Sequence, residues 1–476
     1  MLGSFNSSSE EEEASPSSDL HFLHHQITTT PPPSHSLSHS PGTSTTRISS
    51  FPNSALHMRQ LLISCADLIS RSDFASAHRL LSVLSSNSSP FGDSTERLVH
   101  AFTKALSLRL NRHTPTTTTT PPFITNPISG ASSSNNVEDE VQSSYLSLNQ
   151  IAPFIRFSQL TANQAILEAI EQGQQQQAAI HILDFDIMHG VQWPPFMQAI
   201  ADRRPPPFLR ITGTGHDAEL LRRTGDRLRR FAESLGLNFE FNPVLLLSSN
   251  PYALNDLFLP SALQLLPDET LAVNCVLFLH RMLRDDVDDH DDSRGRGREL
   301  LKVFLHKIKA MNPKVVTVAE REANHNHPVY MKRFVEALDH YTAIFDSLEA
   351  TLPPHSRERM NVESVWFGRE IVDIVAGEGE ERIERHERFE SWQVMLRSCG
   401  FSNVPLSPFA LSQAKLLLRL HYPSEGYQLQ ILNNSCCFLG WQNHPLFSIL
   451  KHQNPSYPGT SSTLSSKVNL NQQATM

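Results

Sequence analysis

Two aspartates lie where an apolar strand is expected to end, a position that could place them in a ligand site. Residues 179–183 (AIHIL) are mostly branched and apolar, which predicts a strand buried on both faces. Asp184 and Asp186 follow, Gly190 supplies a turn, and residues 193–195 (WPP) open a helix. Open α/β sheets bind ligands at such strand ends. Alternatively, both carboxylates accept hydrogen bonds from backbone amides of the turn, and their role is structural.

Two other polar clusters invite comparison with metal sites. Residues 320–327 (EREANHNH) combine carboxylates with two histidines, but their spacing matches no zinc or two-metal pattern. Their alternating charges would instead fix Arg321 in a buried network or present a surface to a partner. The acidic run 285–292 has no EF-hand spacing and is expected to be a mobile surface loop. The chain also lacks GxSxG, HExxH, P-loop and GxGxxG motifs, so we expect no catalytic, cofactor-binding or metal-binding residues.

Arginines on one predicted helix, residues 218–235, form the candidate surface for DNA. Arg223, Arg227 and Arg230 stand at positions i, i+4 and i+7, so they share a face of that helix. Three acidic residues are interleaved with them and could neutralise the face by pairing: Glu219, Asp226 and Glu233. The formal net charge of −9 argues against a strongly basic nucleic-acid clamp without excluding a local basic patch. A nucleic-acid surface and a solvated, self-neutralised face therefore both stay open.

Strand-like and helix-like segments alternate along the middle of the chain. Strands are predicted at residues 179–183, 208–212, 239–244, 271–279 and 314–319. Helices are predicted at residues 218–235, 255–266, 299–311 and 330–340. This alternation predicts a doubly wound, mostly parallel α/β sheet of Rossmann type with helices on both faces. Near the end, residues 428–432 and 437–441 flank Asn433-Asn434-Ser435, which predicts an antiparallel hairpin.

The remaining segments are helical or too polar to form a core. Residues 1–53 and 454–476 are rich in Ser, Thr, Pro and Asn, which predicts disordered tails. Residues 54–170 have helical periodicity and predict an N-terminal helical cap, interrupted by a low-complexity insertion at 111–144. Within the cap, Asp93 and Glu96 have the spacing of a capping box.

Charge and cysteine usage add two expectations. The charged residues at 357–363 and 378–387 are expected to pair along helices. The five cysteines show no CxxC spacing, which indicates unpaired, buried thiols in a reducing compartment, and no apolar run has the length of a transmembrane span.

Several motifs resemble those of the GRAS family of plant regulators. Five residues resemble its VHIID motif: Ile180, His181, Ile182, Leu183 and Asp184. Pro328, Arg369 and Glu370 resemble elements of its PFYRE motif, and Trp392, Gly440 and Trp441 match its SAW region. The expected Ser-Ala-Trp near the end is replaced by Ser448-Ile449-Leu450, so the last segment is expected to be rearranged or dispensable.

The resemblance implies one GRAS-type domain over residues 54–453. Its parts would be the helical cap with the first leucine-rich region (54–170), the VHIID region and the start of the second leucine-rich region (171–242), the rest of the α/β core (243–310), the PFYRE region (311–390) and the SAW region (391–453).

GRAS domains have a methyltransferase-like core, so an S-adenosylmethionine-dependent methyltransferase is one hypothesis. Such sites need a glycine-rich first turn and an acidic residue after the second strand. Residues 184–190 contain one glycine, and Asp217 follows the second strand only after His216. Neither feature is complete in this sequence, which favours a protein without a catalytic site or a cofactor.

The resemblance is closest to the Lateral suppressor branch, and it implies a nuclear transcriptional regulator required to start axillary meristems. We expect a non-catalytic scaffold that binds transcription factors and co-regulators, is compatible with a homo- or heterodimer, and has no membrane association. DNA would be reached directly or through partners. The alternatives are sequence-specific DNA binding through the helix carrying Arg222–Arg230, and methyl transfer.

Overall fold

A computed structural model describes residues 51–113, 134–172, 178–246, 263, 265–266, 268–285, 296–353, 355–432 and 436–454. The two tails lie almost entirely outside these residues, as do most of the predicted insertion at 111–144 and most of the helix predicted at 255–266. Within the acidic run at 285–292, the structure describes Asp285 alone.

The first five helices form the N-terminal part of the fold. They are α1 (Phe51–Ser70), α2 (Phe74–Ser86), α3 (Ser94–His113), α4 (Ser134–Ile151) and α5 (Pro153–Glu171). The capping box is confirmed, because Glu96 N donates to Asp93 Oδ1 at 2.9 Å and Asp93 N donates to Glu96 Oε2 at 3.1 Å. The prediction that irregular chain continues to residue 144 is wrong, since α4 already begins at Ser134.

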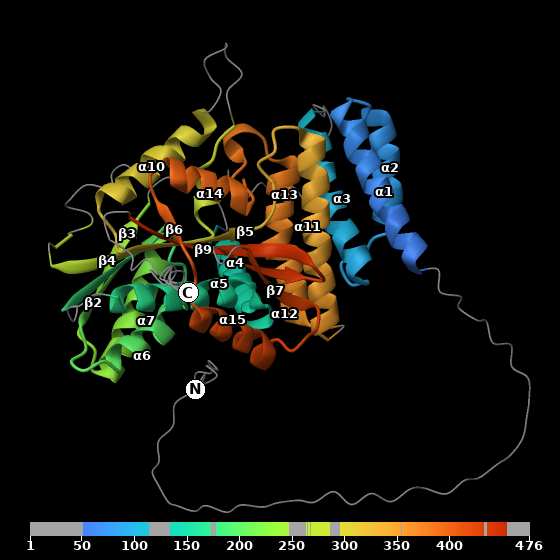
Figure 1. Ribbon diagram of the computed structural model, residues 1–476. Helices are drawn as coiled ribbons and strands as arrows, with labels where there is room; N and C mark the ends of the chain where they lie inside the picture. The colour runs from blue at the N-terminus through green and yellow to red at the C-terminus, as the bar shows by residue number, and fades with distance from the viewer. Residues whose placement is uncertain are drawn as a thin grey trace, which may run out of the picture. The chain divides into compact units, whose positions relative to one another are not determined.

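A nine-stranded mixed sheet is the centre of the fold (Figure 1). Its strands are β1 (Ala179–Asp184), β2 (Phe208–Gly215), β3 (Phe239–Leu245), β4 (Glu269–Val276), β5 (Val315–Arg321), β6 (Ser402–Val404), β7 (Tyr427–Leu432), β8 (Cys436–Trp441) and β9 (His444–Gln453). The order is β3-β2-β1-β4-β5-β9-β8-β7, with β6 paired to β9. The first five strands pair in parallel and the last four pair antiparallel. The doubly wound α/β fold is therefore confirmed, and so are both strands of the predicted hairpin.

The end of the chain corrects one prediction. Ser448, Ile449 and Leu450 were expected to lie in a rearranged or dispensable segment, but they are fully buried in β9. β9 pairs with β5 along one edge and with β8 and β6 along the other. Because it closes the junction between the parallel and antiparallel halves of the sheet, β9 is an integral strand.

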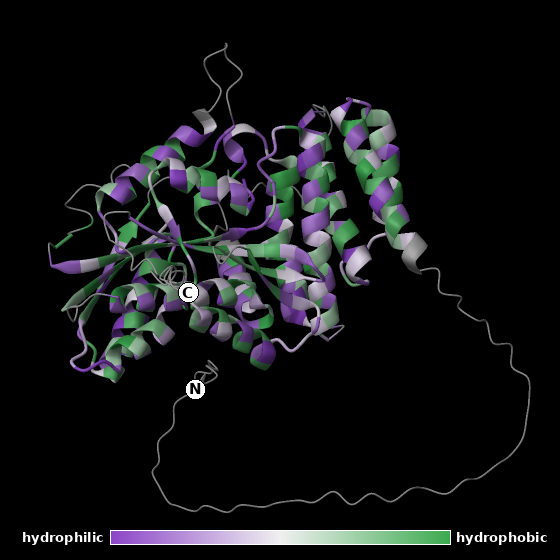
Figure 2. Cartoon of the chain, in the orientation of Figure 1, coloured by the Kyte–Doolittle hydropathy of each residue, from purple (hydrophilic) through white to green (hydrophobic). Residues whose placement is uncertain are grey.

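Helices cover both faces of the sheet, and alternate strand residues point to opposite faces. On one face, Ile180 and Ile182 pack with α5, α6 (Trp193–Ala201) and α7 (Ala218–Leu235). On the other face, Val273 and Cys275 pack with α10 (Glu299–Ala310) and α14 (Phe389–Ser398). Figure 2 shows the strands as largely hydrophobic, while the helices carry both kinds of residue.

A third cluster of buried apolar residues joins the cap to the C-terminal strands. It contains residues of α1, α2, α3 and α5 together with α11 (Tyr330–Thr351), α13 (Gly368–Ala376) and α15 (Pro408–His421). The shorter helical elements are α12 (Arg357–Asn361), η2 (Leu279–Met282), η3 (Arg296–Arg298), η4 (Val362–Phe367) and η5 (Gly379–Glu381). All five cysteines are free and buried, as predicted. None of the described helices has the length and apolar character needed to cross a membrane.

Charged side chains that were expected to pair along helices pair mainly across the fold. Arg97 of α3 contacts Glu363 of η4 at 2.7 Å and Glu349 of α11 at 2.8 Å. Arg359 contacts Glu349 at 3.2 Å, while its contact along the helix with Glu363 is longer, at 4.0 Å. Residues 382–388 are not helical at all. The prediction is wrong because both arginines are buried, where a charge needs close partners from the surrounding elements.

Candidate functional site

The two aspartates at the end of β1 are held by side chains of neighbouring elements. Asp184 accepts hydrogen bonds from Trp193 Nε1 at 2.8 Å and from Asn274 Nδ2 at 2.7 Å. Asp186 accepts a hydrogen bond from Arg281 at 2.5 Å. The expected bonds to backbone amides of the turn are therefore replaced by bonds that tie β1 to α6, β4 and η2. Burial raises the pKa of Asp184 to about 7, although both hydrogen bonds favour its ionised form.

The turn after β1 has the backbone of a glycine-rich loop but carries side chains. Asp186, Met188 and Gly190 all have positive φ angles, of 64°, 48° and 62°. Glycine is needed at 190, where a Cβ atom would lie 2.8 Å from Thr224 Cγ2. At the other two positions the chain accepts a conformation that is uncommon for residues with side chains.

Those side chains help to fill the place where doubly wound folds hold a ligand. A cavity of about 30 Å³ is left at the carboxyl ends of β1 and β4. It is lined by Tyr145, Asp184, Asp186, Ile187, Met188 and Trp366, among others. Pockets for drug-sized ligands measure about 300–1,000 Å³, whereas a space of this size holds one or two water molecules. A nucleoside cofactor does not fit here.

The other residues of the VHIID-like stretch serve packing and one buried polar contact. Ile180 and Ile182 face α6 and α7, and Leu183 faces α10. His181 Nε2 lies 2.8 Å from Thr212 Oγ1, and its Nδ1 lies 3.3 Å from a carboxylate oxygen of Glu269. Burial, followed by the charge of Arg210, lowers the pKa of His181 to about 4.

The arginines of α7 are exposed, and most of them already have partners. Arg222 and Arg223 contact Glu219 at 2.7 Å, and Arg229 contacts Asp226 at 2.9 Å. Arg227 donates a hydrogen bond to the carbonyl of His189, so it holds the turn before α6. Arg230 donates to the carbonyl of its own helix at Asp226, at 3.3 Å. Two of the three candidate arginines on this surface therefore have a structural role. Glu219 neutralises Arg223, and Arg227 supports the turn before α6.

A second polar centre lies at the end of β5, where Arg321 is fully buried. Its guanidinium forms an ion pair with Glu370 of α13, and Glu370 also accepts a hydrogen bond from Tyr341 Oη at 2.9 Å. The rings of Phe367 and Phe447 lie 5.5 and 5.0 Å from the guanidinium carbon. Burial raises the pKa of Glu370 against the opposing effect of Arg321. Arg321 is thus fixed in a buried network, the first of the two roles expected for it.

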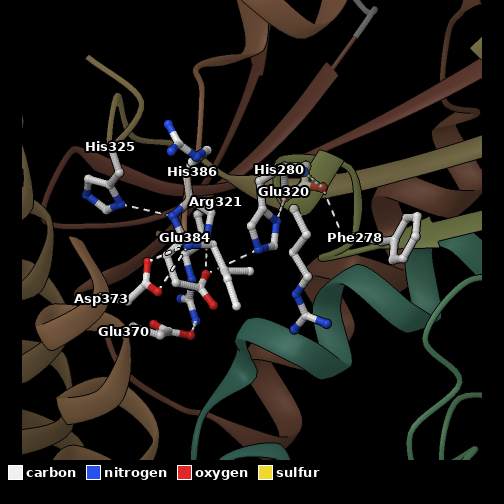
Figure 3. Close-up of polar contacts among 12 residues, drawn as sticks. Phe278, His280, Glu320, Arg321, His325, Glu370, Asp373, Glu384 and His386 are labelled. Atoms are coloured by element: carbon white, nitrogen blue, oxygen red, sulfur yellow. Dashed lines mark hydrogen bonds and ion pairs between the residues drawn. The ribbon is translucent and has the colours of Figure 1, made fainter. Parts of the chain in front are cut away.

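Histidines and carboxylates from separate segments meet beside this ion pair (Figure 3). Glu320 of β5 accepts hydrogen bonds from the backbone amides of Phe278, Leu279 and His280 at 3.1, 2.7 and 3.3 Å. Its second oxygen lies 2.7 Å from His280 Nδ1. Burial lowers the pKa of His280, but Glu320 and Glu384 outweigh this effect and the pKa is raised to about 9.

The segment 382–388 supplies the other members of this cluster. Asp373 holds it by accepting hydrogen bonds from the backbone amides of Ile383 and Glu384 at 3.0 and 2.7 Å. His280, Glu384 and His386 bring ligand-type atoms within 4.8 Å of one another. The sequence patterns predict no role for His280 or His386, and they predict that Glu384 pairs with another charge along a helix. Gly377 and Gly379 were the available signal, because two glycines so close together disfavour a continuous helix.

Comparison with known proteins decides the family. The GRAS domain family matches residues 58–450. Scarecrow-like protein 18 of Arabidopsis thaliana is 52% identical over 415 residues, which cover 82% of this chain and 90% of that protein. Protein MONOCULM 1 of Oryza sativa subsp. japonica is 43% identical over 415 residues, covering 82% and 87%. The crystal structure of SCL7 in Oryza sativa has a TM-score of 0.66 at 33% identity and covers 83% of this chain and 99% of that one. The chain belongs to the GRAS family of transcriptional regulators.

Several GRAS motif residues occupy buried positions in this structure. Trp392 packs in the cluster between β4 and α14, and Trp441 lies in β8 with its ring 4.9 Å from that of Tyr427. A Cβ atom at Gly440 would lie 2.5 Å from the carbonyl oxygen of His444, so this position needs glycine for close backbone approach. Of the three residues assigned to PFYRE, Glu370 is buried, whereas Pro328 and Arg369 are exposed.

Proposed function

We propose that this GRAS protein is a nuclear transcriptional regulator that acts as a non-catalytic scaffold for transcription factors and co-regulators and promotes the initiation of lateral shoots. One relative supports the developmental part: protein MONOCULM 1, whose name refers to a single culm, is similar over most of its length. Nuclear placement is proposed from the same membership, since a transcriptional regulator acts where the genome is.

The observation that carries the non-catalytic part is the filled strand-end cavity. In open α/β folds this edge of the sheet is where a ligand binds. Here Ile187, Met188 and Trp366 leave about 30 Å³ of space. Asp217, the acidic residue after β2, caps α7 by accepting hydrogen bonds from the backbone amides of Glu219 and Leu220, so it presents no free carboxylate to a ribose. Both observations support a protein that keeps the fold of a cofactor-binding domain but fills the cofactor site with its own side chains.

A titration tests this part directly. Full-length protein is titrated with S-adenosylmethionine in a calorimeter, with an active methyltransferase as the positive control. We expect no heat of binding at ligand concentrations up to about 1 mM, which corresponds to an affinity weaker than about 4 kcal/mol. A dissociation constant in the micromolar range would refute the scaffold proposal, because it would show that the cavity opens to admit the cofactor.

A genetic experiment tests the developmental part. The gene is inactivated in the source plant, and lateral shoots are counted with and without a transgene that encodes the full chain fused to a fluorescent protein. We expect fewer lateral shoots in the mutant, recovery with the transgene, and fluorescence in nuclei. Normal branching in a verified null plant, or rescue by a fusion confined to the cytoplasm by an added export signal, would contradict the proposal.

A further inference from the structure

The cluster of His280, Glu384 and His386 has a feature that hydrogen bonding alone does not explain. His280 Nε2 and His386 Nε2 lie 3.2 and 3.1 Å from one carboxylate oxygen, Oε2 of Glu384. Both nitrogens are buried, and neither is placed to form a hydrogen bond. The two imidazoles are 2% and 0% exposed, so bulk solvent does not reach them. Buried nitrogen atoms in native proteins are normally paired, so these two need another explanation.

The contacts of the two Nδ1 atoms indicate which nitrogen of each ring carries the proton. His280 Nδ1 lies 2.7 Å from Glu320, a carboxylate already anchored by three backbone amides, and it is therefore the N–H donor of that contact. His386 Nδ1 lies 2.9 Å from His325 Nδ1, a contact in which His386 can donate. With both Nδ1 atoms donating, the two Nε2 lone pairs face a carboxylate oxygen once no proton occupies them. The raised pKa of His280 describes the cluster without an ion, in which a proton on Nε2 takes the place of the cation. Three acceptors at this separation repel one another unless a cation lies among them.

We propose that His280 Nε2, His386 Nε2 and Glu384 Oε2 bind one divalent transition-metal ion of the zinc type. Two ligands bonded to a tetrahedral zinc at about 2.0–2.1 Å are about 3.3 Å apart, close to the nitrogen–oxygen separations observed here. Two imidazoles and a carboxylate are a recognised zinc ligand set, in which a water molecule commonly takes the fourth position. Imidazole ligands favour zinc, copper, nickel or iron over calcium and magnesium.

The surroundings fit a bound cation in two further respects. A histidine that binds a metal usually donates its other N–H to a carboxylate, which orients the ring, and Glu320 does this for His280. The charge also balances locally, since Glu320 and Glu384 together offset a divalent ion, while Arg321 is already neutralised by Glu370. His280 belongs to η2, and Glu384 and His386 belong to the segment 382–388; Figure 3 shows the three side chains together. One ion would therefore join the end of β4 to the irregular chain before α14.

The alternative is a proton-only network in which His280 is doubly protonated and donates to both Glu320 and Glu384. It requires His386 to be protonated on Nε2 and to accept at Nδ1 from His325. The nitrogen–oxygen distances of 3.2 and 3.1 Å allow this arrangement, but neither contact qualifies as a hydrogen bond. A measurement of metal content separates the two explanations.

The test uses full-length protein, purified without a polyhistidine tag, and elemental analysis by mass spectrometry. We expect close to one equivalent of zinc per chain in the unmodified protein and loss of at least tenfold in Glu384→Gln and in His386→Asn. His340→Gln is the matched control, because His340 is also a buried imidazole but lies outside the ligand set. It should retain its metal.

A second measurement covers the case in which the ligand variants fail to fold. Unmodified protein is treated with a chelator and then titrated with Co²⁺, which should give the visible absorption bands of a tetrahedral site and raise the Tm by several degrees. Less than a tenth of an equivalent of any transition metal, together with no cobalt spectrum and no change in Tm, would overturn the proposal. Undiminished metal content in Glu384→Gln and His386→Asn would overturn it as well, because the ion would then lie elsewhere.

Discussion

Replacing Glu370 by glutamine removes the negative charge beside Arg321 and leaves the size of the side chain almost unchanged. Arg321 is 1% exposed, and its second terminal nitrogen already lacks a hydrogen-bond partner. The rings of Phe367 and Phe447 also lie close to it but cannot replace a carboxylate. Glu384, the other carboxylate that acts on Arg321, already contacts His280 and His386. The substitution therefore leaves the buried guanidinium of Arg321 without its ion-pair partner. Breaking a buried ion pair in this way destabilises a protein by about 3–5 kcal/mol.

The effect on the melting temperature follows from the size of the folded region that the structure describes. This region contains roughly 350 residues between Phe51 and Asn454, and an unfolding entropy of about 2.1 cal/mol/K per residue gives about 0.7 kcal/mol/K. The loss of 3–5 kcal/mol should lower the Tm by about 4–7 °C. Differential scanning calorimetry at pH 8 is the appropriate assay. Because burial raises the pKa of Glu370, an assay at acid pH would begin with part of the carboxylate already protonated.

Two matched variants sharpen the comparison. Tyr341→Phe removes the hydrogen bond to Glu370 but leaves the ion pair, so it should cost about 1.5 kcal/mol and lower the Tm by about 2 °C. Arg369→Gln changes the adjacent, exposed residue and should alter stability by no more than about 0.5 kcal/mol. If Glu370→Gln melts within 1 °C of Arg369→Gln, the buried pair does not stabilise the fold in the way described.

Three further predictions address the sheet and the arginine helix. Arg223→Glu combined with Arg230→Glu should change the affinity for a promoter fragment less than twofold, as measured by fluorescence anisotropy, because Arg223 is already paired with Glu219. A tenfold loss of affinity would instead support direct DNA binding through α7. The raised pKa of Asp184 means that the folded state holds this proton, so its contribution to stability should fall by up to about 1.4 kcal/mol per pH unit as the pH rises from about 4 to about 7. In urea unfolding at pH 5 to 8, this slope should be absent from Asp184→Asn, and an unchanged slope would contradict the assignment. A chain that ends after Gln442 should be insoluble, because β5, β6 and β8 lose their partner strand; a soluble product with the full far-ultraviolet spectrum would show that β9 is dispensable.

The parts of the fold that follow from local pattern could be predicted from the sequence. The run 179–183 is apolar except for His181, and it forms β1, which packs on both faces. The helix at 218–235 begins at the cap Asp217 and ends at Gly236, whose φ of 64° is left-handed, so its bounds are set by neighbouring residues. In both cases the determining interactions lie within one element or one turn.

Contacts between distant segments could not be predicted in the same way. The sequence of β9 mixes polar and apolar residues without a distinctive pattern. Its central position in the sheet depends on pairing with β5, which lies more than a hundred residues earlier in the chain. The charges at 382–388 resemble a solvated helix in the sequence, yet Arg385 is fully buried and contacts Asp285. Burial of a charge is decided by partners that the fold brings from elsewhere, and local spacing carries no information about them.

The distribution of motif residues changes how functional data on this GRAS protein should be interpreted. Asp184, Glu370, Trp392 and Trp441 are buried, and the first two hold other elements in place through hydrogen bonds or ion pairs. A substitution at any of them lowers the concentration of folded protein, and a loss of 1–2 kcal/mol is enough to change abundance several-fold in a cell. Loss of the proposed branching activity in such a variant is therefore expected even if no partner touches the residue. Arg369 is exposed beside Glu370, so only a variant there that keeps its Tm and loses activity would identify a contact surface.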